Sequence, residues 1–452
     1  MTATKRFAVR AIFPVQPGWT SLFRPVDAAS GAVFRIVFGT LMLIATLRFF
    51  AHGWISEYYE MPSHFFSYYG FDWVKPWPAP GMYLHFGAMA VLALMVAVGL
   101  YYRVAVVLFG LLFGYAHLID QTNYLNHYYL VICLCGLMAF LPLHATWSLD
   151  ARRDPKVRSS TIPAWVVWAL RAQIGLVYVF GGIAKLKYSW VVDAMPLKIW
   201  LPANTDVPII GPWLGQEWTA YAFSWAGLAF DLSIVPLLLW PRSRRYAYCF
   251  VVAFHLMTAK LFTLGMFPWI MMASSLIFLP PSWPRWFVAS RIAEDAPRIA
   301  RRPRLILAAL GVYFAFHVAM PFRHLLYPGE VCWSEQGFRF SWNVMVMEKT
   351  GSVAFRVVEP STGRAWDVVP TTYLTRYQTK MMSTQPDHIL QLAHIIADDY
   401  RRRGVLDPEV RVDAFASLNG KPRQRLIDPT VDLARETDRL APQAWILPRS
   451  SP

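Results

Sequence analysis

The chain has 452 residues, of which 56% are hydrophobic, 16% aromatic and only 16% charged. A soluble domain carries about 25% charged residues, so this composition indicates a membrane protein with several spans and excludes an ordinary soluble domain. The formal net charge is +15, but most of it falls in short loops between apolar segments, where the positive-inside rule accounts for it. Nucleic acid is therefore not an expected partner, whereas the lipid bilayer is.

Nine apolar segments are suited to crossing a hydrocarbon layer of about 30 Å. They lie at 29–50, 82–102, 104–119, 128–143, 163–184, 221–240, 246–264, 267–280 and 304–322. The two segments on either side of Gly265 could also form one interrupted element, so eight spans are an alternative to nine.

Basic residues assign the loops to two sides of the membrane. The N-terminal stretch, with Lys5, Arg6 and Arg10, contains no apolar run of the kind that a cleavable signal peptide needs. The loops expected on the cytoplasmic side are the N-terminus, the one with Arg103, and 150–158, 241–245 and 285–304. The loops expected outside are 51–81, 120–127 and 186–220, together with the C-terminal part.

The C-terminal part differs in composition and predicts an α+β domain. Strands are expected at 339–349 and 353–359, the second followed by a turn at 360–364 and a hairpin partner. A helix is expected at 386–404, with Pro386 at its start and Gly404 at its end, and Asn419-Gly420 is typical of a hairpin turn. The expected fold is thus an all-α polytopic membrane helix bundle (1–322), an extracytoplasmic α+β domain (323–435) and a loosely ordered tail (436–452).

Two ionisable residues lie inside apolar segments, where an unpaired charge costs a few kcal/mol. Asp231 lies in "AGLAFDLSIVPLLLW", and Arg171 in the preceding span is a plausible partner for it. A structural ion pair between helices is the simpler explanation. His255 is more often a core histidine than a catalyst, although a role in a site is also open.

A polar cluster in "DQTNYLNHYYL" (120–130) is expected at the outer edge of the bilayer. It contains Asp120, Asn123, Asn126 and His127. Polar residues at such an edge can simply cap helices. Together with Lys185, which is expected at the same depth, they could form a small acid–base site.

The stretch "LVYVFGGIAKLKYSW" (176–190) ends with two lysines. Lys185 and Lys187 point about 200° apart on a helix, so only one of them can face a pocket. Gly181 lies one turn before Lys185 and leaves room beside its stem for a flat ring. Lys187 lies closer to the headgroups and suits snorkelling, in which the charged end of the side chain lifts into the headgroup layer.

Metal and haem sites are not expected. Cys133 and Cys135 have no partners at metal-ligand spacing, so they indicate helix packing. His117 and His127 are separated by a helix junction rather than stacked at one depth on facing spans, which argues against paired haem ligands.

Several separate motifs, in order along most of the chain, resemble the vitamin K-dependent gamma-glutamyl carboxylases. These enzymes combine a horizontally transferred transmembrane domain with an outer domain. The similar stretches are "LFRPVDAASGAVFRIVFGTLM" (22–42), "LIDQTNYLNHYYL", "LRAQIGLVYVFGGIAKL", "FDLS", "FH…LFTLGMF", "FSWNVMVM" and "RQRLIDPTVDL". The last two lie in the outer domain and separate the chain from proteins that share only the transmembrane domain.

The resemblance implies a cofactor, a reaction and a set of site residues. Lys185 occupies the position of a lysine that deprotonates vitamin K hydroquinone, or a related reduced naphthoquinone, which then reacts with dioxygen. The strongly basic oxygenated quinone removes the γ-proton of a glutamate in a protein or peptide substrate, carbon dioxide adds to the carbanion, and the quinone leaves as its epoxide. His127 and Asn126 match the histidine and asparagine beside the quinone. The other expected binding residues are Tyr124, Asp120, His255, Phe267, Met345, Arg171 and Asp231; no metal is implied.

A lysine suits this chemistry because an amine that is removed from water loses its proton more readily and can then act as a base. The pocket must also exclude water, which would quench the reactive intermediate. A site at the bilayer edge lets a lipid-soluble quinone enter sideways while a peptide approaches from outside.

The chain departs from the family pattern at several positions. Ala184 stands where a second lysine precedes the catalytic one, and Tyr124 stands where tryptophan is usual. Met347 and Lys349 stand where the carboxylases carry a histidine and an arginine, so quinone epoxidation is better supported than glutamate carboxylation. Cys332 has no obvious disulfide partner in the loop 51–81. The alternatives are therefore a quinone epoxidase or oxygenase of the same fold without carboxylation, and a non-catalytic polytopic binding or transport protein.

Overall fold

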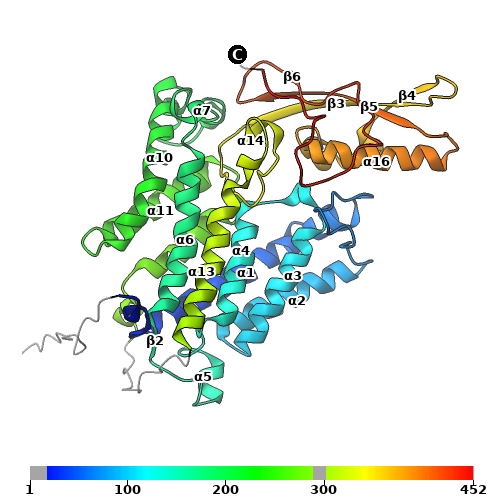
Figure 1. Cartoon of the computed structure of the whole chain (residues 1–452). Coiled ribbons are helices and arrows are strands. Elements are labelled where there is room, and N and C mark those ends of the chain that lie inside the picture. Colours follow the sequence, from blue (N-terminus) through cyan, green and yellow to red (C-terminus); the bar gives the residue numbers. More distant parts are fainter. Residues whose placement is uncertain (1–17, 289–301, 451–452) are drawn as a thin grey trace, which may run out of the picture.

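The computed structural model describes residues 18–288 and 302–450. The absence of a signal peptide and most of the basic segment 285–304 concern residues outside these ranges. The described chain forms a helix bundle with an α+β domain at one end of it (Figure 1). The long helices of the bundle are α1 (Ala29–Ala51), α2 (Gly81–Val98), α3 (Tyr102–Leu118), α4 (Asn126–Phe140), α6 (Ala164–Ala184), α10 (Glu217–Leu239), α11 (Arg244–Leu261), α12 (Phe267–Ser275) and α13 (Pro303–Ala319). The shorter elements are β1 (Pro25–Asp27), α5 (Leu149–Arg153), β2 (Thr161–Pro163), α7 (Tyr188–Val191), α8 (Leu197–Trp200) and α9 (Gly211–Leu214).

Each of the nine predicted apolar segments overlaps one of these long helices, but nine membrane spans are not confirmed. Within the described ranges, 5 helices are long and apolar enough to cross a membrane: α1, α2, α6, α10 and the helical stretch 303–326. The apolar helices 102–118, 126–140 and 267–278 are shorter. The helical structure is interrupted around Gly265. Helix α11 ends at Leu261 and α12 begins at Phe267, and Gly265 between them has a left-handed φ of 56°.

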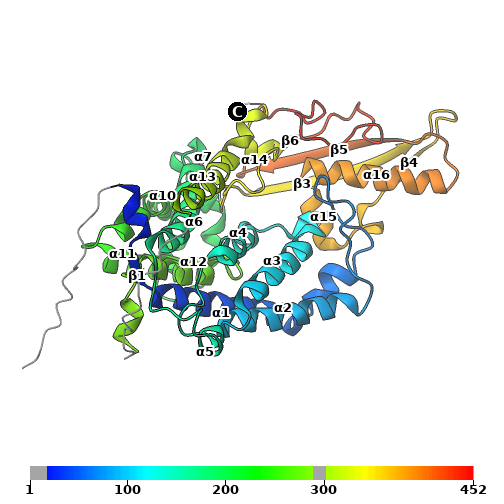
Figure 2. The same cartoon turned by 60° about the horizontal axis from the view of Figure 1, so that its bottom comes forward.

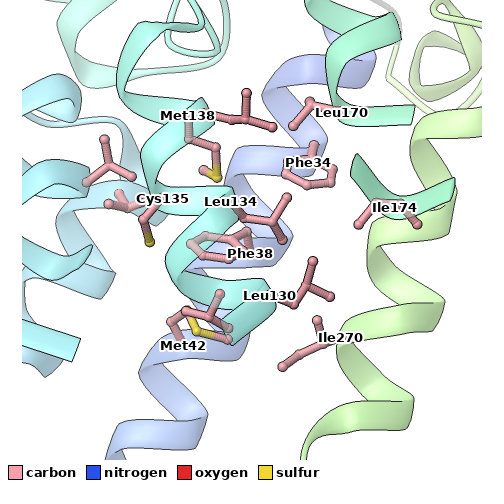
Figure 3. Packing of buried hydrophobic residues seen from close by; sticks show 14 of the residues in the cluster. Phe34, Phe38, Met42, Leu130, Leu134, Cys135, Met138, Leu170, Ile174 and Ile270 are labelled. Carbon is pink, nitrogen blue, oxygen red and sulfur yellow. The ribbon is translucent and has the colours of Figure 1, made fainter. Parts of the chain in front are cut away.

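The centre of the bundle is a tightly packed apolar core in which α1, α4, α6 and α12 meet (Figure 3). Its labelled members are Phe34, Phe38, Met42, Leu130, Leu134, Cys135, Met138, Leu170, Ile174 and Ile270. In lipid, van der Waals packing of this kind holds helices together, because the lipid tails are as apolar as the side chains. Cys135 is free and buried in this core, and Cys133 is free and buried beside it on α4, as expected for packing residues.

A four-stranded antiparallel sheet, in the order β4-β3-β5-β6, forms the second domain. Its elements are α14 (Val331–Ser334), β3 (Lys349–Val358), β4 (Ala365–Val368), α15 (Arg376–Met382), α16 (Pro386–Arg402), β5 (Glu409–Leu418) and β6 (Gln424–Arg425). The inward residues of β5 alternate with exposed ones, as in a half-buried strand. Helix α16 lies between the sheet and the helix bundle (Figures 1 and 2), where His388 stacks on Phe66.

The hairpins and the helix of this domain follow the sequence prediction closely. Gly404, just beyond α16, has φ 91°, and Asn419 and Gly420 have φ 54° and 70°. Two successive residues with positive φ form the type I′ turn that joins antiparallel strands. A turn at 359–364 likewise joins β3 to β4.

Two predictions for this domain are wrong. The strand expected at 339–349 is irregular up to residue 348, and Phe340, Trp342 and Met345 have φ of 61°, 54° and 55°. This segment, which we call the crossing segment (339–348), runs over the bundle and cannot keep an extended conformation there. The tail from 436 is not loose: Trp445 is buried, and Trp333 Nε1 donates a hydrogen bond to Leu447 O at 2.8 Å.

Candidate active site

Lys185 lies directly after the end of α6 and its side chain is buried. Its Nζ lies 2.7 Å from Asp231 Oδ2 and 3.2 Å from Gly181 O, and the residue is only 6% exposed. The ring of Trp190 lies 5.3 Å from the same Nζ. The buried partner of Asp231 is therefore Lys185, and the predicted pair of Asp231 with Arg171 is wrong.

Arg171 lies near the opposite end of α6. Fourteen residues of helix separate it from Lys185, which corresponds to roughly 20 Å. Its guanidinium donates hydrogen bonds to the carbonyls of Ile277, Phe278 and Leu279 at 2.9, 3.3 and 3.1 Å. Arg171 thus satisfies the carbonyls that end a helix, and it takes no part in the lysine site.

The glycine pair before Lys185 allows α10 to approach α6 closely. A Cβ at Gly182 would lie 2.6 Å from Leu232 Cδ2, and one at Gly181 would lie 3.5 Å from Asp231 Oδ2. A side chain at Gly182 would therefore clash with Leu232 unless that side chain moved. The glycines therefore bring the carboxylate of Asp231 within hydrogen-bond distance of Lys185.

Lys185 and Asp231 line an apolar cavity of about 300 Å³, which we call the lysine cavity. His255 lines it too and is 2% exposed. Tyr178 Oη lies 3.1 Å from His255 Nε2 and 3.0 Å from Ser275 Oγ, whereas His255 Nδ1 has no hydrogen-bond partner among the described residues. His255 is thus both a core histidine and a cavity residue.

His127 and Asn126 line a second cavity, of about 580 Å³, which we call the histidine cavity. His127 is 6% exposed. None of the hydrogen bonds in the described chain involves its ring. Asn126 is fixed in place, because its Oδ1 accepts from Tyr124 Oη at 3.0 Å and its Nδ2 donates to Asn343 O at 3.2 Å.

The two cavities are neighbours and share four lining residues, which we call the shared wall: Leu264, Phe267, Val344 and Met345. The ring of Phe267 lies 6.0 Å from that of His255 on one side and 6.1 Å from that of His127 on the other. The residues expected in one site thus lie in two adjacent cavities. The predicted residues Phe267 and Met345 form part of the wall between them.

Asp120 and Tyr124 line neither cavity, although binding roles are predicted for both. Asp120 accepts hydrogen bonds from Thr122 N at 2.9 Å and from Gln378 Nε2 at 2.8 Å, and burial raises the pKa of its carboxyl group. Tyr124 Oη accepts from Phe340 N at 2.6 Å. Both residues tie the loop between α3 and α4 to the second domain, so they position the site rather than line it.

Sequence reasoning missed Tyr178, and in the crossing segment it identified Met345 but missed Val344. Tyr178 precedes Lys185 by seven residues, which is two helical turns, so helical spacing could have identified it. Lys187 does not lie free at the headgroups, since its Nζ donates to Cys332 Sγ at 3.0 Å. It diverges from Lys185 because α6 ends at Ala184 and Lys187 is already extended.

Comparisons with known proteins assign both parts of the chain. A family model for the HTTM domain matches residues 23–283, which include every helix that lines the two cavities except α15, whose Tyr377 lines the histidine cavity. A model for the lumenal domain of vitamin K-dependent gamma-carboxylase matches residues 302–451, which include Val344 and Met345 of the shared wall. No solved structure matches the chain.

Proposed function

Since this chain belongs to the vitamin K-dependent gamma-carboxylase family, we propose that it oxidises a reduced naphthoquinone with dioxygen at Lys185 and couples this reaction to carboxylation of a protein glutamate. It is a multi-pass membrane protein with a lumenal C-terminal region. The proposal rests above all on the Lys185–Asp231 pair, which is buried in an apolar cavity next to the cavity that His127 lines. The quinone site belongs to the helical domain, which we assign to residues 1–322, with the N-terminus in the cytoplasm.

The residues present suit a reduced naphthoquinone such as vitamin K hydroquinone. The lysine cavity is lined by aromatic and aliphatic side chains, and both cavities have volumes in or near the range of about 300–1,000 Å³ typical of ligand sites. Two buried histidines offer ring nitrogens that no described residue satisfies, at His255 Nδ1 and on His127. When bound, the quinone supplies the reaction with dioxygen that drives removal of the glutamate γ-proton.

Lys185 must hold a free electron pair before it can act as a base. An ammonium at Nζ can pass one proton to Asp231 Oδ2, which lies 2.7 Å away. The Nζ of Lys185 can then take the hydroxyl proton of the bound ring, and Asp231 acts as its proton store.

His127 and Asn126 can bind an oxygen of the ring where the bound molecule reaches past the shared wall into the histidine cavity. A hydrogen bond to a charged oxygen is about twice as strong as a neutral one, so donors at this point favour the deprotonated ring. Tyr124 and Asn343 O hold the Asn126 amide in place. The crossing segment closes over the two cavities with the apolar residues Val344 and Met345, which helps to exclude water.

A quinone epoxidase without carboxylation is the second candidate, and the environment of Lys349 favours it. Lys349 stands where the resemblance places an arginine. Its Nζ is bound to Glu335 Oε1 at 3.0 Å and to Trp333 O at 2.6 Å, and it lines neither cavity. Met347 packs into the core of the lumenal domain. Neither position therefore presents a polar group to the lysine cavity.

Two assays on the purified protein in detergent test the proposal. Reduced vitamin K and oxygen are first supplied without peptide, and the quinone epoxide is quantified by chromatography. Epoxide formation supports the hypothesis that the protein is an enzyme, whereas quinone binding without turnover supports a binding or transport protein. A glutamate-containing peptide and labelled carbon dioxide are then added: label in the peptide supports the carboxylase, and its absence beside continued epoxide formation supports the epoxidase.

A further inference from the structure

A third cavity, of about 220 Å³, lies outside the candidate active site and is lined by Arg24, Arg171 and Arg244. Its lining comes from β1, the first half of α6, the end of α10 and the start of α11. These segments lie at the end of the bundle away from the lumenal domain (Figure 1). The remaining lining is apolar and includes Trp168 and Pro281. We call it the arginine cavity.

Helix capping accounts for only part of the hydrogen-bonding capacity of these arginines. Arg171 donates hydrogen bonds from Nε and Nη2 to carbonyls beyond α12. Arg244 donates from Nε to Leu238 O and from Nη2 to Leu239 O, both at 2.8 Å. In both, Nη1 has no partner in the described chain, although Arg171 is only 8% exposed. The Arg24 side chain makes no hydrogen bond to any described residue.

The charges of the arginine cavity are not balanced by a carboxylate within the described ranges. Asp27 lies close in sequence to Arg24, but its carboxylate accepts hydrogen bonds of 2.5 and 2.9 Å from the guanidinium of Arg285. Arg171 and Arg244 carry like charges and line the same cavity. Arg24 is exposed and Arg244 is half-buried, whereas Arg171 is buried, so the cost of an unbalanced charge falls mainly on Arg171 and an anion in the cavity would offset it.

We propose that the arginine cavity binds a phosphate group, carried either by an anionic phospholipid headgroup or by a soluble phosphate. Guanidinium groups match the geometry of phosphate oxygens and donate two bonds at once. The cavity of about 220 Å³ can hold a phosphate group, because it has room for several groups of the size of a water molecule, which occupies about 30 Å³. Its apolar lining and the partly exposed Trp168 suit the glycerol and acyl region of a lipid at the membrane interface. The proposal does not depend on the quinone chemistry.

Thermal unfolding of the full-length protein in detergent tests this site. The added probes are phosphatidylglycerol, phosphatidylcholine and inorganic phosphate. The key variants are Arg24→Gln, which breaks no hydrogen bond of the described chain, and Arg244→Gln. Arg152→Gln, an exposed arginine of α5 on the same side, is the matched control. We expect phosphatidylglycerol to raise the Tm of the wild type and of the control, and to bind about tenfold more weakly to each key variant, because each loses a charge-assisted hydrogen bond.

The probes distinguish the two sources of phosphate. A shift with phosphatidylglycerol but not with inorganic phosphate identifies a lipid headgroup, whereas equal shifts with both identify a soluble phosphate. Equal binding of phosphatidylglycerol and phosphatidylcholine would overturn the proposal, because the charge would then be irrelevant. Wild-type affinity in Arg24→Gln and Arg244→Gln would overturn it as well. If Arg244→Gln fails to fold, Arg24→Gln alone decides the matter.

Discussion

Lys185 Nζ and Asp231 Oδ2 lie 2.7 Å apart in a cavity that is otherwise almost entirely apolar. Their side chains are 8% and 10% exposed. A buried ion pair is weak evidence for stability, because the cost of removing two charges from water offsets their attraction. Because the pair also lines a cavity of ligand size, it is better suited to transferring a proton than to stabilising the fold. This leads to the first two predictions.

Replacing Lys185 by alanine should abolish quinone oxidation. A positioned general base contributes about 10²–10⁴-fold to a rate, and no other lysine lines the lysine cavity among the described residues. Lys187→Ala is the matched control, because Lys187 contacts Cys332 instead; it should keep turnover close to wild type. The measurement is epoxide formation by the purified variants.

Chemical rescue makes the Lys185 test sharper. A small amine added to Lys185→Ala, or assay at high pH, should partly restore turnover, since the missing part is a base. A dead Lys187→Ala variant, or no recovery under either condition, would show that Lys185 is not the base.

Asp231→Asn should lower quinone turnover by about 100-fold or more, because an amide cannot store the proton. It also leaves the Lys185 ammonium without a counter-charge, which costs about 3–5 kcal/mol in comparable buried pairs. The double variant Lys185→Met with Asp231→Leu should regain the Tm without regaining turnover. Asp206→Asn, an exposed carboxylate, is the control. Wild-type turnover in a folded Asp231→Asn protein would reduce the pair to a structural contact.

His127→Ala should lose epoxide formation while the protein still folds. The His127 ring makes no hydrogen bond to the described chain and lines the histidine cavity, so its loss removes a ligand contact rather than a structural one. His52→Ala, at the exposed end of α1, is the control. The variant is assayed for epoxide and for Tm; unchanged turnover would mean that the histidine cavity takes no part in the reaction.

The sequence was sufficient to predict the helices, the hairpin turns and the buried lysine, because each depends on local patterns. Apolar runs mark the helices, and Asn419-Gly420 marks a turn whose positive φ values few residues tolerate. The "GG…K" stretch singles out Lys185, because ionisable residues in or next to membrane helices are rare and usually functional.

Pairings between distant segments could not be predicted in this way. Asp231 pairs with Lys185 rather than Arg171 because the close packing of α6 on α10 at Gly182 sets which side chains meet. The division into two cavities depends on Phe267 and on the crossing segment. The residues of that segment favour a strand, but positive φ values at Phe340, Trp342 and Met345 bend its backbone over the bundle.

Reporter fusions should place the connection between α10 and α11 and the C-terminus on opposite sides of the membrane. A reporter after Arg244 should be cytoplasmic, and one after Pro452 should lie outside, because basic and neutral or acidic loops alternate between the two positions. Protease accessibility or a compartment-specific enzyme reporter measures this. Both reporters on the same side would mean that one span is miscounted, most simply near Gly265.

The stability of the lumenal domain should fall as the pH drops below 6.5, owing to His388. Burial lowers the pKa of His388 to about 3, and its Nε2 lies 3.0 Å from Arg339 Nη2, which can donate to it. The native state therefore keeps His388 neutral while the unfolded chain takes up a proton below about pH 6.5. Each pH unit below that value then costs about 1.4 kcal/mol, or roughly 2 kcal/mol at pH 5.

His388→Gln isolates this effect, because the amide oxygen can still accept from Arg339 but does not titrate. Asp387 does not interfere: burial raises its pKa, but Arg339 overrides this and holds the pKa below the usual value. Its contribution is therefore lost only as the pH falls below about 4. Comparing the Tm at pH 7 and pH 5 in the wild type, in His388→Gln and in the exposed control His52→Gln gives the measurement. The loss of Tm should be several degrees smaller in His388→Gln than in the other two; equal losses in all three would show that another group carries the pH dependence.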